Sequence, residues 1–480
     1  MPAGRFGVPA GTSPTTFLLP GRANVFAAAR PQSETLLWGV NQVNLTEPIL
    51  LLFVMCAIIA VASVLFKGKW GMIAPVMFVT SLVMMLVAGQ GFQLRVATEG
   101  PFVYIDTIMW VLTGAGFVFA LYRNGTFDYL FNKIIAAKRG NFVQMLLLVL
   151  FIGLPGMITG SALACVASTG LMAGKYLLDK GVDKAKVVEL VAVGSLLGMM
   201  MPPLSIPGMG IYISRSGIYP ASWEGLFLPM LVVTVPALIA YSVMAGKRIL
   251  GGVEADANAD KSGSALCLVP LLVVFVLVLG YNFLYTVLPY YGGYPVIYLI
   301  GFVLALVCKN KGFNALTAYT EGITATAIEL ALIMGYASLV ETVTFAGVSG
   351  TIQAQLLLSG INNNMTTLVL VAITLVGGFF LGSPFAYALA GLFTTLITNY
   401  NSFYPASGFE MPVLGYSIAI SLTLLMSLRG GIVSHVCDTL ETGEVKARGV
   451  IKNALVPAIV MLLVAVMYIM ASNQTIALMI

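Results

Sequence analysis

The chain carries little charge, a single histidine and no paired cysteines. Only 9% of its 480 residues are charged, whereas soluble domains carry about a quarter. His435 is the one histidine, so a zinc site built on histidine ligands has almost no material. The five cysteines lie in or beside apolar segments without a CxxC pair, which favours free thiols over a disulfide framework or a metal site.

Motifs of nucleotide chemistry and of nucleophilic catalysis are also missing. The chain has no Walker A motif, no glycine fingerprint of a dinucleotide-binding fold and no nucleophile elbow. ATP-driven transport within this chain is therefore disfavoured. We expect a protein that is not an enzyme and that holds no cofactor.

Apolar segments dominate the sequence instead. Hydrophobic residues make up 59% of the chain, and many windows reach the roughly 17–25 residues that a transmembrane helix needs. We predict an all-α polytopic membrane protein with about ten transmembrane helices and two re-entrant hairpins. The predicted hairpins are 143–174 and 366–400, and the predicted spans are 48–66, 70–90, 104–122, 187–214, 226–246, 265–285, 294–308, 323–345, 411–436 and 453–471.

Composition divides the chain into four parts. Residues 1–45 contain arginines, prolines and glycines but no apolar run long enough for a signal-peptide core, so we expect a flexible tail. Residues 251–264 form a polar, acidic linker. This linker separates a first half, 46–250, from a second half, 265–480, and we expect one hairpin and one broken helix in each half.

Glycines and polar residues interrupt the apolar pattern twice in each half. The interrupted stretches are FIGLPGMITGSA (Phe151–Ala162), GSLLGMMMPPLS (Gly194–Ser205), GGFFLGSP (Gly377–Pro384) and SLRGGIVS (Ser427–Ser434). Lipid cannot hydrogen-bond a loose backbone, so such breaks persist only where they line a cavity. A hairpin followed by a broken helix in each half is typical of a secondary transporter that binds its solute near the midplane. For any single break, a simple proline kink is the alternative.

The positions of Lys and Arg give the two hairpins opposite orientations. Basic residues flank both ends of the first hairpin, so we expect it to open to the cytoplasm. The flanks of the second hairpin, 360–367 and 399–410, contain no Lys or Arg, so we expect it to open to the outside. Two hairpins of opposite orientation indicate an inverted repeat.

The first candidate site combines the tip of the first hairpin with the broken helix behind it. Gly156, Thr159, Gly160 and Ser161 are expected to provide free carbonyls and hydroxyl oxygens. Pro202 and Pro203 cannot donate backbone N–H groups, so we expect carbonyls from Gly198 to Met201 to lose their partners. Such hard oxygen ligands suit Na⁺, and the end of a half-helix adds partial charge.

The second candidate site combines Gly382 and Ser383 with Arg429, Gly430 and Ser434. Arg429 lies deep in an apolar run, where a charge is expensive and usually functional. Its guanidinium can clamp a substrate carboxylate through two hydrogen bonds.

Two questions about charged residues near this site stay open. Arg429 can instead form a structural ion pair with Glu329 or Glu341. His435 follows Arg429 on the same segment, where either a proton relay or a structural role is conceivable.

At these motifs the chain resembles the large membrane subunit of tripartite ATP-independent periplasmic (TRAP) transporters, the DctM-like permeases. The most specific stretch is Ile158–Tyr212, which is similar to the hairpin, basic loop and double-proline segment of that family. The resemblance implies an elevator mechanism in the bacterial inner membrane, with a mobile unit made of the hairpins and broken helices. It also implies Na⁺ sites, and the first would use Thr159, Ser161, Gly198, Met201 and Pro203.

The same resemblance implies partners and a class of substrate. The partners are a small four-helix membrane subunit and a periplasmic solute-binding protein that delivers an organic acid. The second half departs from the family pattern, because Leu428-Arg429-Gly430-Gly431 replaces a proline pair and Gly382-Ser383 replaces an acidic residue. This departure changes the residues that are expected to form the second Na⁺ site and to bind the substrate.

We therefore expect Na⁺-coupled uptake of a small organic anion. One alternative within the superfamily is proton coupling through His435 or Glu329. Another is transport without a binding protein. A membrane enzyme or a scaffold protein is the alternative from another class, and it predicts one polar cluster on one membrane face.

Overall fold

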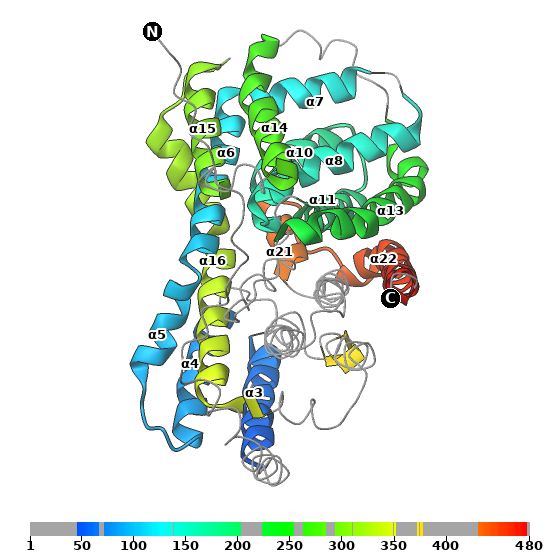
Figure 1. Ribbon diagram of the computed structural model, residues 1–480. Helices are drawn as coiled ribbons and strands as arrows, with labels where there is room; N and C mark the ends of the chain where they lie inside the picture. The colour runs from blue at the N-terminus through cyan, green and yellow to red at the C-terminus, as the bar shows by residue number, and fades with distance from the viewer. Residues whose placement is uncertain are drawn as a thin grey trace, which may run out of the picture. The chain divides into compact units, whose positions relative to one another are not determined.

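A computed structural model describes the helical part of the chain. The described residues are 46–66, 72–137, 139–202, 223–253, 263–284, 293–309, 311–348, 350–351, 372–373, 375–377 and 431–477. The chain divides into two units, Met1–Leu45 and Thr46–Ile480, and all described residues belong to the second. Within these residues the regular structure is helical throughout, which confirms the all-α prediction (Figure 1).

Five of the helices belong to the N-terminal part of the first half. They are α3 (Thr46–Leu65), α4 (Ile73–Val87), α5 (Leu94–Val103), α6 (Ile105–Asn124) and α7 (Thr126–Ala136). The sequence analysis did not single out α5 or α7, since α5 contains Arg95 and Glu99 and α7 is short and amphipathic. Neither helix has the uniform apolar character on which the span prediction relies.

The remaining helices of the first half form the hairpin and the elements around it. They are α8 (Asn141–Thr159), α9 (Ala162–Cys165), the π-helix η2 (Val166–Gly170), α10 (Leu171–Asp179), α11 (Lys184–Met200) and α13 (Trp223–Leu250). In the second half the described elements are η4 (Ala265–Leu268), α14 (Val269–Leu284), α15 (Gly293–Val307), α16 (Ala315–Phe345), α21 (Gly431–Leu440) and α22 (Ala447–Ala477).

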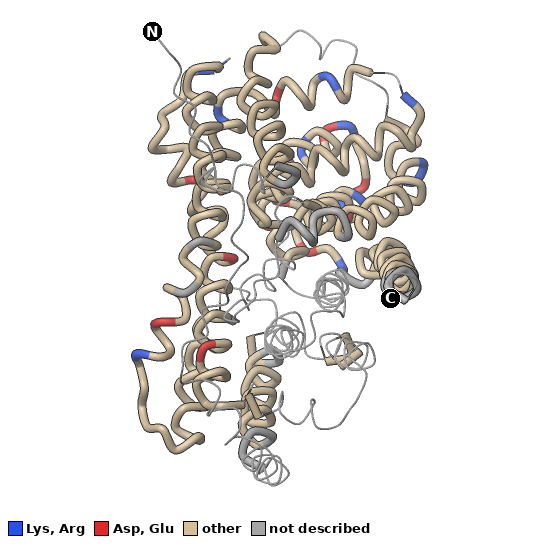
Figure 2. Tube along the Cα trace, in the orientation of Figure 1, with Lys and Arg blue, Asp and Glu red and all other residues tan. Residues whose placement is uncertain are grey.

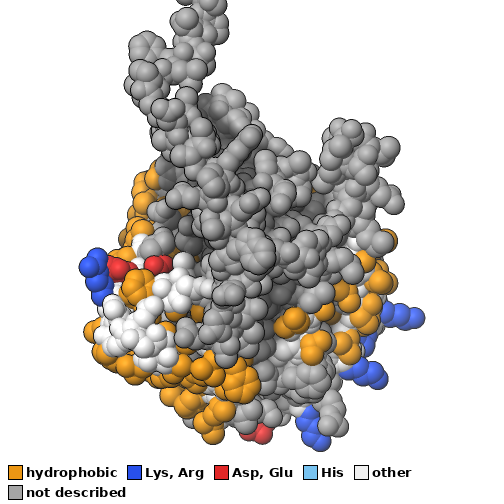
Figure 3. All heavy atoms as spheres, turned by 60° about the horizontal axis from the view of Figure 1, so that its bottom comes forward, with side chains coloured by type: hydrophobic (Ala, Val, Ile, Leu, Met, Phe, Trp, Pro, Cys, Tyr) orange, Lys and Arg blue, Asp and Glu red, His pale blue; other side chains and the backbone are white. Residues whose placement is uncertain are grey.

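Several described helices are long and apolar enough to cross a membrane. They are Asn141–Thr159, Met230–Leu250, Ala315–Phe345 and Gly449–Tyr468, and the bent pair Leu94–Phe102 and Thr107–Asn124 adds a further candidate. Shorter apolar helices cover Leu50–Ala62, Ala74–Val87, Ala265–Tyr281 and Gly293–Val307. Figure 3 shows hydrophobic side chains over much of the described surface on one face. The chain is therefore a multi-pass membrane protein.

The long helix α16 is the centre of one group of helices. It packs against α4, α5 and α6, and α15 packs against α6. Glycines allow some of these close approaches, because a Cβ on Gly100 would lie 2.5 Å from the carbonyl oxygen of Ala337. A Cβ on Gly322 would similarly lie 2.6 Å from the carbonyl oxygen of Ala115. Small residues are the usual means by which membrane helices approach each other closely.

A second group of helices surrounds α8 and α11. The helix α13 packs against both α8 and α22, while α21 packs against α9, η2, α10 and α11. The two groups meet where α6 contacts α8 and where α16 contacts α9. The hairpin therefore lies between α16 and the last helices of the chain.

A buried carboxylate joins three helices of the second group. Glu189 of α11 forms an ion pair with Arg248 of α13, and its Oε2 accepts a hydrogen bond of 2.7 Å from Asn453 Nδ2 of α22. Tyr241 donates a further hydrogen bond of 3.3 Å to Glu189 Oε1. Arg248 is 31% exposed and Glu189 only 4% exposed at their side chains. This network satisfies the one acid that α11 buries among apolar residues.

Two lysines contact helices that are distant from them in the sequence. Lys186 Nζ donates 3.1 Å to the carbonyl oxygen of Arg248, and Lys311 pairs with Asp128. Figure 2 marks the Lys and Arg positions along the trace. The assignment of the basic segments to one membrane side stays a prediction.

Several predictions about the second half lie outside the described residues. These include the hairpin 366–400 except for a few residues near 372–377, and most of the span 411–436. The inverted repeat and the exact number of spans therefore stay predictions, as does the flexible tail 1–45.

Candidate functional site

The tip of the first hairpin is a two-residue turn between α8 and α9. The helix α8 runs through Pro155 to Thr159, and Gly160 then takes the left-handed conformation with φ of 66°. This conformation suits glycine, because it has no Cβ. Ser161 follows in an extended conformation, and its Oγ caps α9 by accepting a hydrogen bond of 2.9 Å from Ala164 N. The sequence TGSA thus encodes a helix end, a reversal and a serine N-cap.

Both hydroxyl groups of the turn are buried and hydrogen-bonded. Thr159 Oγ1 donates 2.8 Å to the carbonyl oxygen of Pro155 and accepts 3.0 Å from Ser161 N. Ser161 Oγ donates 2.8 Å to Glu329 Oε1 of α16. The same carboxylate oxygen accepts a hydrogen bond of 3.1 Å from Leu163 N. The tip is therefore tied to a helix that is distant in the sequence.

The chain returns from the tip along α8. Thr169 Oγ1 donates 2.9 Å to the carbonyl oxygen of Ile152, which places η2 beside the middle of α8. The helices α9, η2 and α10 follow one another without a gap from Ala162 to Asp179. A π-helical turn inside such a helix is rare and occurs frequently at functional sites. The predicted hairpin 143–174 thus corresponds to α8 paired with this returning helix.

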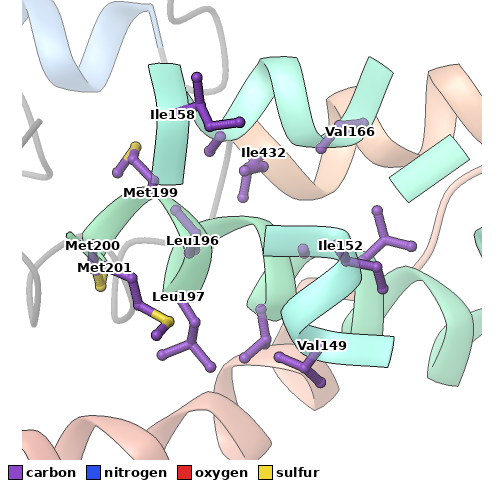
Figure 4. Close-up of a cluster of buried hydrophobic side chains, with 14 of the residues drawn as sticks. Val149, Ile152, Ile158, Val166, Leu196, Leu197, Met199, Met200, Met201 and Ile432 are labelled. Carbon is purple, nitrogen blue, oxygen red and sulfur yellow. The ribbon is translucent and has the colours of Figure 1, made fainter. Parts of the chain in front are cut away.

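The end of α11 packs directly against α8 through glycines. A Cβ on Gly198 would lie 2.2 Å from Gly153 Cα, and a Cβ on Gly156 would lie 2.7 Å from Met199 N. The helix α11 stops at Met200, and Met201 is extended and buried. Figure 4 shows Met199, Met200 and Met201 in this cluster together with Ile158. The helix α11 therefore ends beside the hairpin, and the predicted continuation of a broken helix after Pro203 lies outside the described residues.

The prediction of free carbonyls in these stretches was wrong in two places. The carbonyl oxygen of Gly156 accepts 2.7 Å from Gly160 N, and that of Gly198 accepts 3.1 Å from Met201 N. Glycine and proline do not interrupt α8 before Thr159. The glycines of FIGLPG serve close packing, because helices 8–10 Å apart need small residues to approach further. Each carbonyl keeps a second lone pair, so a role for Gly198 as an ion ligand stays a prediction.

The second candidate site is described only at its C-terminal end. Ser434 of α21 has an exposed side chain, whereas Ile432 and Val433 on the same helix are buried. The predicted residues outside the described part are Pro203, Gly382, Ser383, Arg429 and Gly430. Their predicted roles, and the choice between a substrate clamp and an ion pair for Arg429, stay predictions.

Among the described hydrogen bonds, none joins His435 or Glu341 to the hydroxyls of Thr159 and Ser161. His435 of α21 and Glu341 of α16 are both half-buried. Within the described residues no group of three His, Cys, Asp or Glu side chains is arranged to hold a metal ion. A cavity of about 390 Å³ is lined by residues of α7, α8, α10 and α13, and none of the tip residues lines it.

Sequence reasoning did not place Glu329 at the tip. It identified Glu329 as an acid inside an apolar segment and considered Arg429 or a proton as its partner. The signal was a carboxylate in the middle of a helix long enough to span the membrane, where an acid is usually functional. Sequence alone offers no means of pairing two residues that are 168 positions apart.

A multi-pass helical protein with a buried, hydroxyl-bearing hairpin tip beside a helix end has the architecture of a secondary membrane transporter. The family described as "Tripartite ATP-independent periplasmic transporter, DctM component" matches residues 49–401, and the chain belongs to this family. The resemblance stated from the sequence is thereby confirmed. No curated protein sequence matches the chain.

Solved transporter structures share the fold. The YdaH transporter of Alcanivorax borkumensis matches with a TM-score of 0.59 at 13% identity, covering 83% of this chain and 97% of that one. MtrF of Neisseria gonorrhoeae, described among antimetabolite efflux pumps, matches with a TM-score of 0.55 at 14% identity, covering 84% and 96%. At these identities the likeness concerns the fold alone.

Proposed function

We propose that this protein couples Na⁺ entry to the uptake of a small organic anion. Its family is one of secondary transporters. The observation that carries the proposal is the hairpin tip, where Thr159 and Ser161 place buried hydroxyl oxygens beside the end of α11. Hard oxygen atoms at a helix interruption are suitable ligands for Na⁺ in a low-dielectric setting. The interruption itself is tolerated because it lies inside protein and not in lipid.

The proposed transport mode is an elevator movement of the hairpins and broken helices. We propose that the chain is the large membrane subunit of a tripartite system in a bacterial inner membrane. A small four-helix membrane subunit and a periplasmic solute-binding protein would be its partners. Membership of the DctM family supports these proposals.

Uptake into proteoliposomes tests this function. The chain would be reconstituted alone and together with a small four-helix subunit and a periplasmic binding protein of the same family of systems. A panel of radiolabelled monocarboxylates and dicarboxylates would be offered with an inward Na⁺ gradient, and with K⁺ replacing Na⁺. We expect uptake of at least one carboxylate only with the Na⁺ gradient. Uptake that is equal in K⁺, or that follows an imposed pH gradient alone, contradicts Na⁺ coupling.

A further inference from the structure

Glu329 is a buried carboxylate with one oxygen that has no partner among the described residues. Its side chain is 3% exposed and lies within the apolar helix α16. Oε1 accepts two hydrogen bonds, from Ser161 Oγ and from Leu163 N. Oε2 is buried and has no hydrogen-bond partner among the residues that the structure describes. A buried carboxylate is costly unless other groups compensate its charge.

The hydrogen bonds of Ser161 determine where its hydroxyl hydrogen points. Ala164 N donates to Ser161 Oγ, so this oxygen already acts as an acceptor. The Ser161 hydrogen is directed at Glu329 Oε1 over 2.8 Å. A hydroxyl oxygen has two lone pairs, so one remains after the bond from Ala164 N. Glu329 thus leaves Ser161 Oγ with a lone pair that no donor among the described residues occupies.

The second hydroxyl of the turn is arranged in the same way. Thr159 Oγ1 gives its hydrogen to the carbonyl oxygen of Pro155 and accepts one bond from Ser161 N. Its remaining lone pair is likewise unused by the described protein groups. A cation is bound by lone pairs and repelled by hydrogens. Because both hydroxyl hydrogens are donated to protein oxygens, the remaining lone pairs of Thr159 Oγ1 and Ser161 Oγ are available to bind a cation.

We propose that Glu329 is a positioning residue for the cation site at the hairpin tip. It orients the Ser161 hydroxyl so that its oxygen faces the ion, and it supplies the negative charge that a bound cation balances. This inference rests on the proposed Na⁺ coupling. Groups that orient metal ligands from outside the coordination sphere commonly affect affinity almost as strongly as the ligands.

Within the described residues, no Lys, Arg or His side chain bonds to Glu329. On the same helix, Glu321 forms a partly exposed ion pair with Arg123. Arg123 therefore already has a carboxylate partner. A cation bound at the tip would therefore balance the negative charge of Glu329, which no described basic side chain balances. The charge of Glu329 should matter separately from its ability to accept hydrogen bonds.

Equilibrium binding of ²²Na⁺ to the purified full-length chain in lipid nanodiscs tests the inference without knowledge of the substrate. Glu329→Gln keeps an oxygen that can accept both tip hydrogen bonds but removes the charge. We expect it to weaken Na⁺ binding about 10- to 100-fold. Glu329→Asp retains the charge and should recover part of the affinity. Glu321→Gln is the matched control on the same helix, with wild-type affinity expected.

A double substitution separates positioning from a general electrostatic or structural effect. If Glu329 acts through Ser161, the losses in Ser161→Ala and Glu329→Gln should be clearly less than additive when combined. Fully additive losses would contradict the positioning role. Thermal midpoints measured on the same samples identify a purely structural role, which would lower the midpoint of Glu329→Gln and leave its Na⁺ affinity unchanged.

Failure of the inference and failure of the proposed function give different results. If the wild-type chain binds ²²Na⁺ saturably and Glu329→Gln binds it equally well, the inference alone is wrong. If the wild-type chain shows no saturable Na⁺ binding, the proposed Na⁺ coupling is wrong and the inference fails with it.

Discussion

The contact between α8 and α11 predicts a strong effect of the smallest possible substitution, Gly198→Ala. An added Cβ would lie 2.2 Å from Gly153 Cα and 2.4 Å from the Gly153 carbonyl oxygen. Carbon atoms in contact normally lie ~3.5–4.0 Å apart. The two helices must therefore separate by about 1.3 Å or more at this point, since backbone atoms cannot rotate away as a side chain can.

The expected loss follows from two opposing contributions. Overpacking a tight interior costs typically about 1–3 kcal/mol, and a backbone clash belongs at the upper end. Replacing glycine by alanine inside a helix contributes about 1 kcal/mol in the opposite direction. We expect Gly198→Ala to reduce the free energy of unfolding by about 2 kcal/mol.

Two other glycines provide controls for this prediction. Gly280 of α14 has no atom within 4 Å of an added Cβ, so Gly280→Ala should be neutral or stabilising by about 1 kcal/mol. At Gly194 the Cβ would meet Ile152 Cγ2 at 3.1 Å, and that side chain can adjust, so the effect should be intermediate.

The assay is denaturant or thermal unfolding of the purified variants in one detergent. The expected order of midpoints is Gly198→Ala lowest, then Gly194→Ala, with Gly280→Ala at or above the wild type. A Gly198→Ala midpoint equal to that of the wild type would refute the close-packing argument. The alanine variant keeps the carbonyl of residue 198, so reduced Na⁺ binding in it reflects displaced helices and not a lost ligand.

Three further substitutions have defined outcomes. Ser161→Ala should raise the Na⁺ concentration for half-maximal uptake, because it removes a hydroxyl ligand; an unchanged Na⁺ curve in proteoliposomes argues against that ligand. Glu189→Ala should destabilise by about 3 kcal/mol in unfolding measurements, because Arg248 loses its buried partner; a wild-type midpoint would mean that the network contributes little. Arg429→Ala should abolish carboxylate uptake while the protein still inserts and elutes as a folded species; full activity would leave only the ion-pair interpretation.

The positions of most apolar helices could be predicted from the sequence. The span predicted at 226–246 lies within α13, Trp223–Leu250, and the span at 453–471 lies within α22, Ala447–Ala477. These predictions succeed because the bilayer requires long apolar segments, and composition reports that requirement directly. The helices α5 and α7 were missed, because Arg95 and Glu99 interrupt the apolar pattern of α5 and because α7 is short and amphipathic.

The glycine-rich stretches show a more specific limit. Glycine in a membrane segment permits either a backbone break or a close helix contact, and the two have the same local sequence. In α8 the glycines at 153 and 156 provide contact, while Gly160 provides the reversal. Whether a glycine provides a close contact or a backbone break depends on whether another helix packs against it.

By itself, the sequence determined the class of this protein: an apolar, multi-pass chain with a hairpin motif that identifies its family. Those properties depend on local composition and spacing, which folding does not alter. Only the tertiary structure decided that Glu329, from a different half of the chain, reaches Ser161 and Leu163 at the hairpin tip. A hydrogen bond requires atoms within about 3 Å of each other, and proximity between distant segments is a property of the packed helices alone.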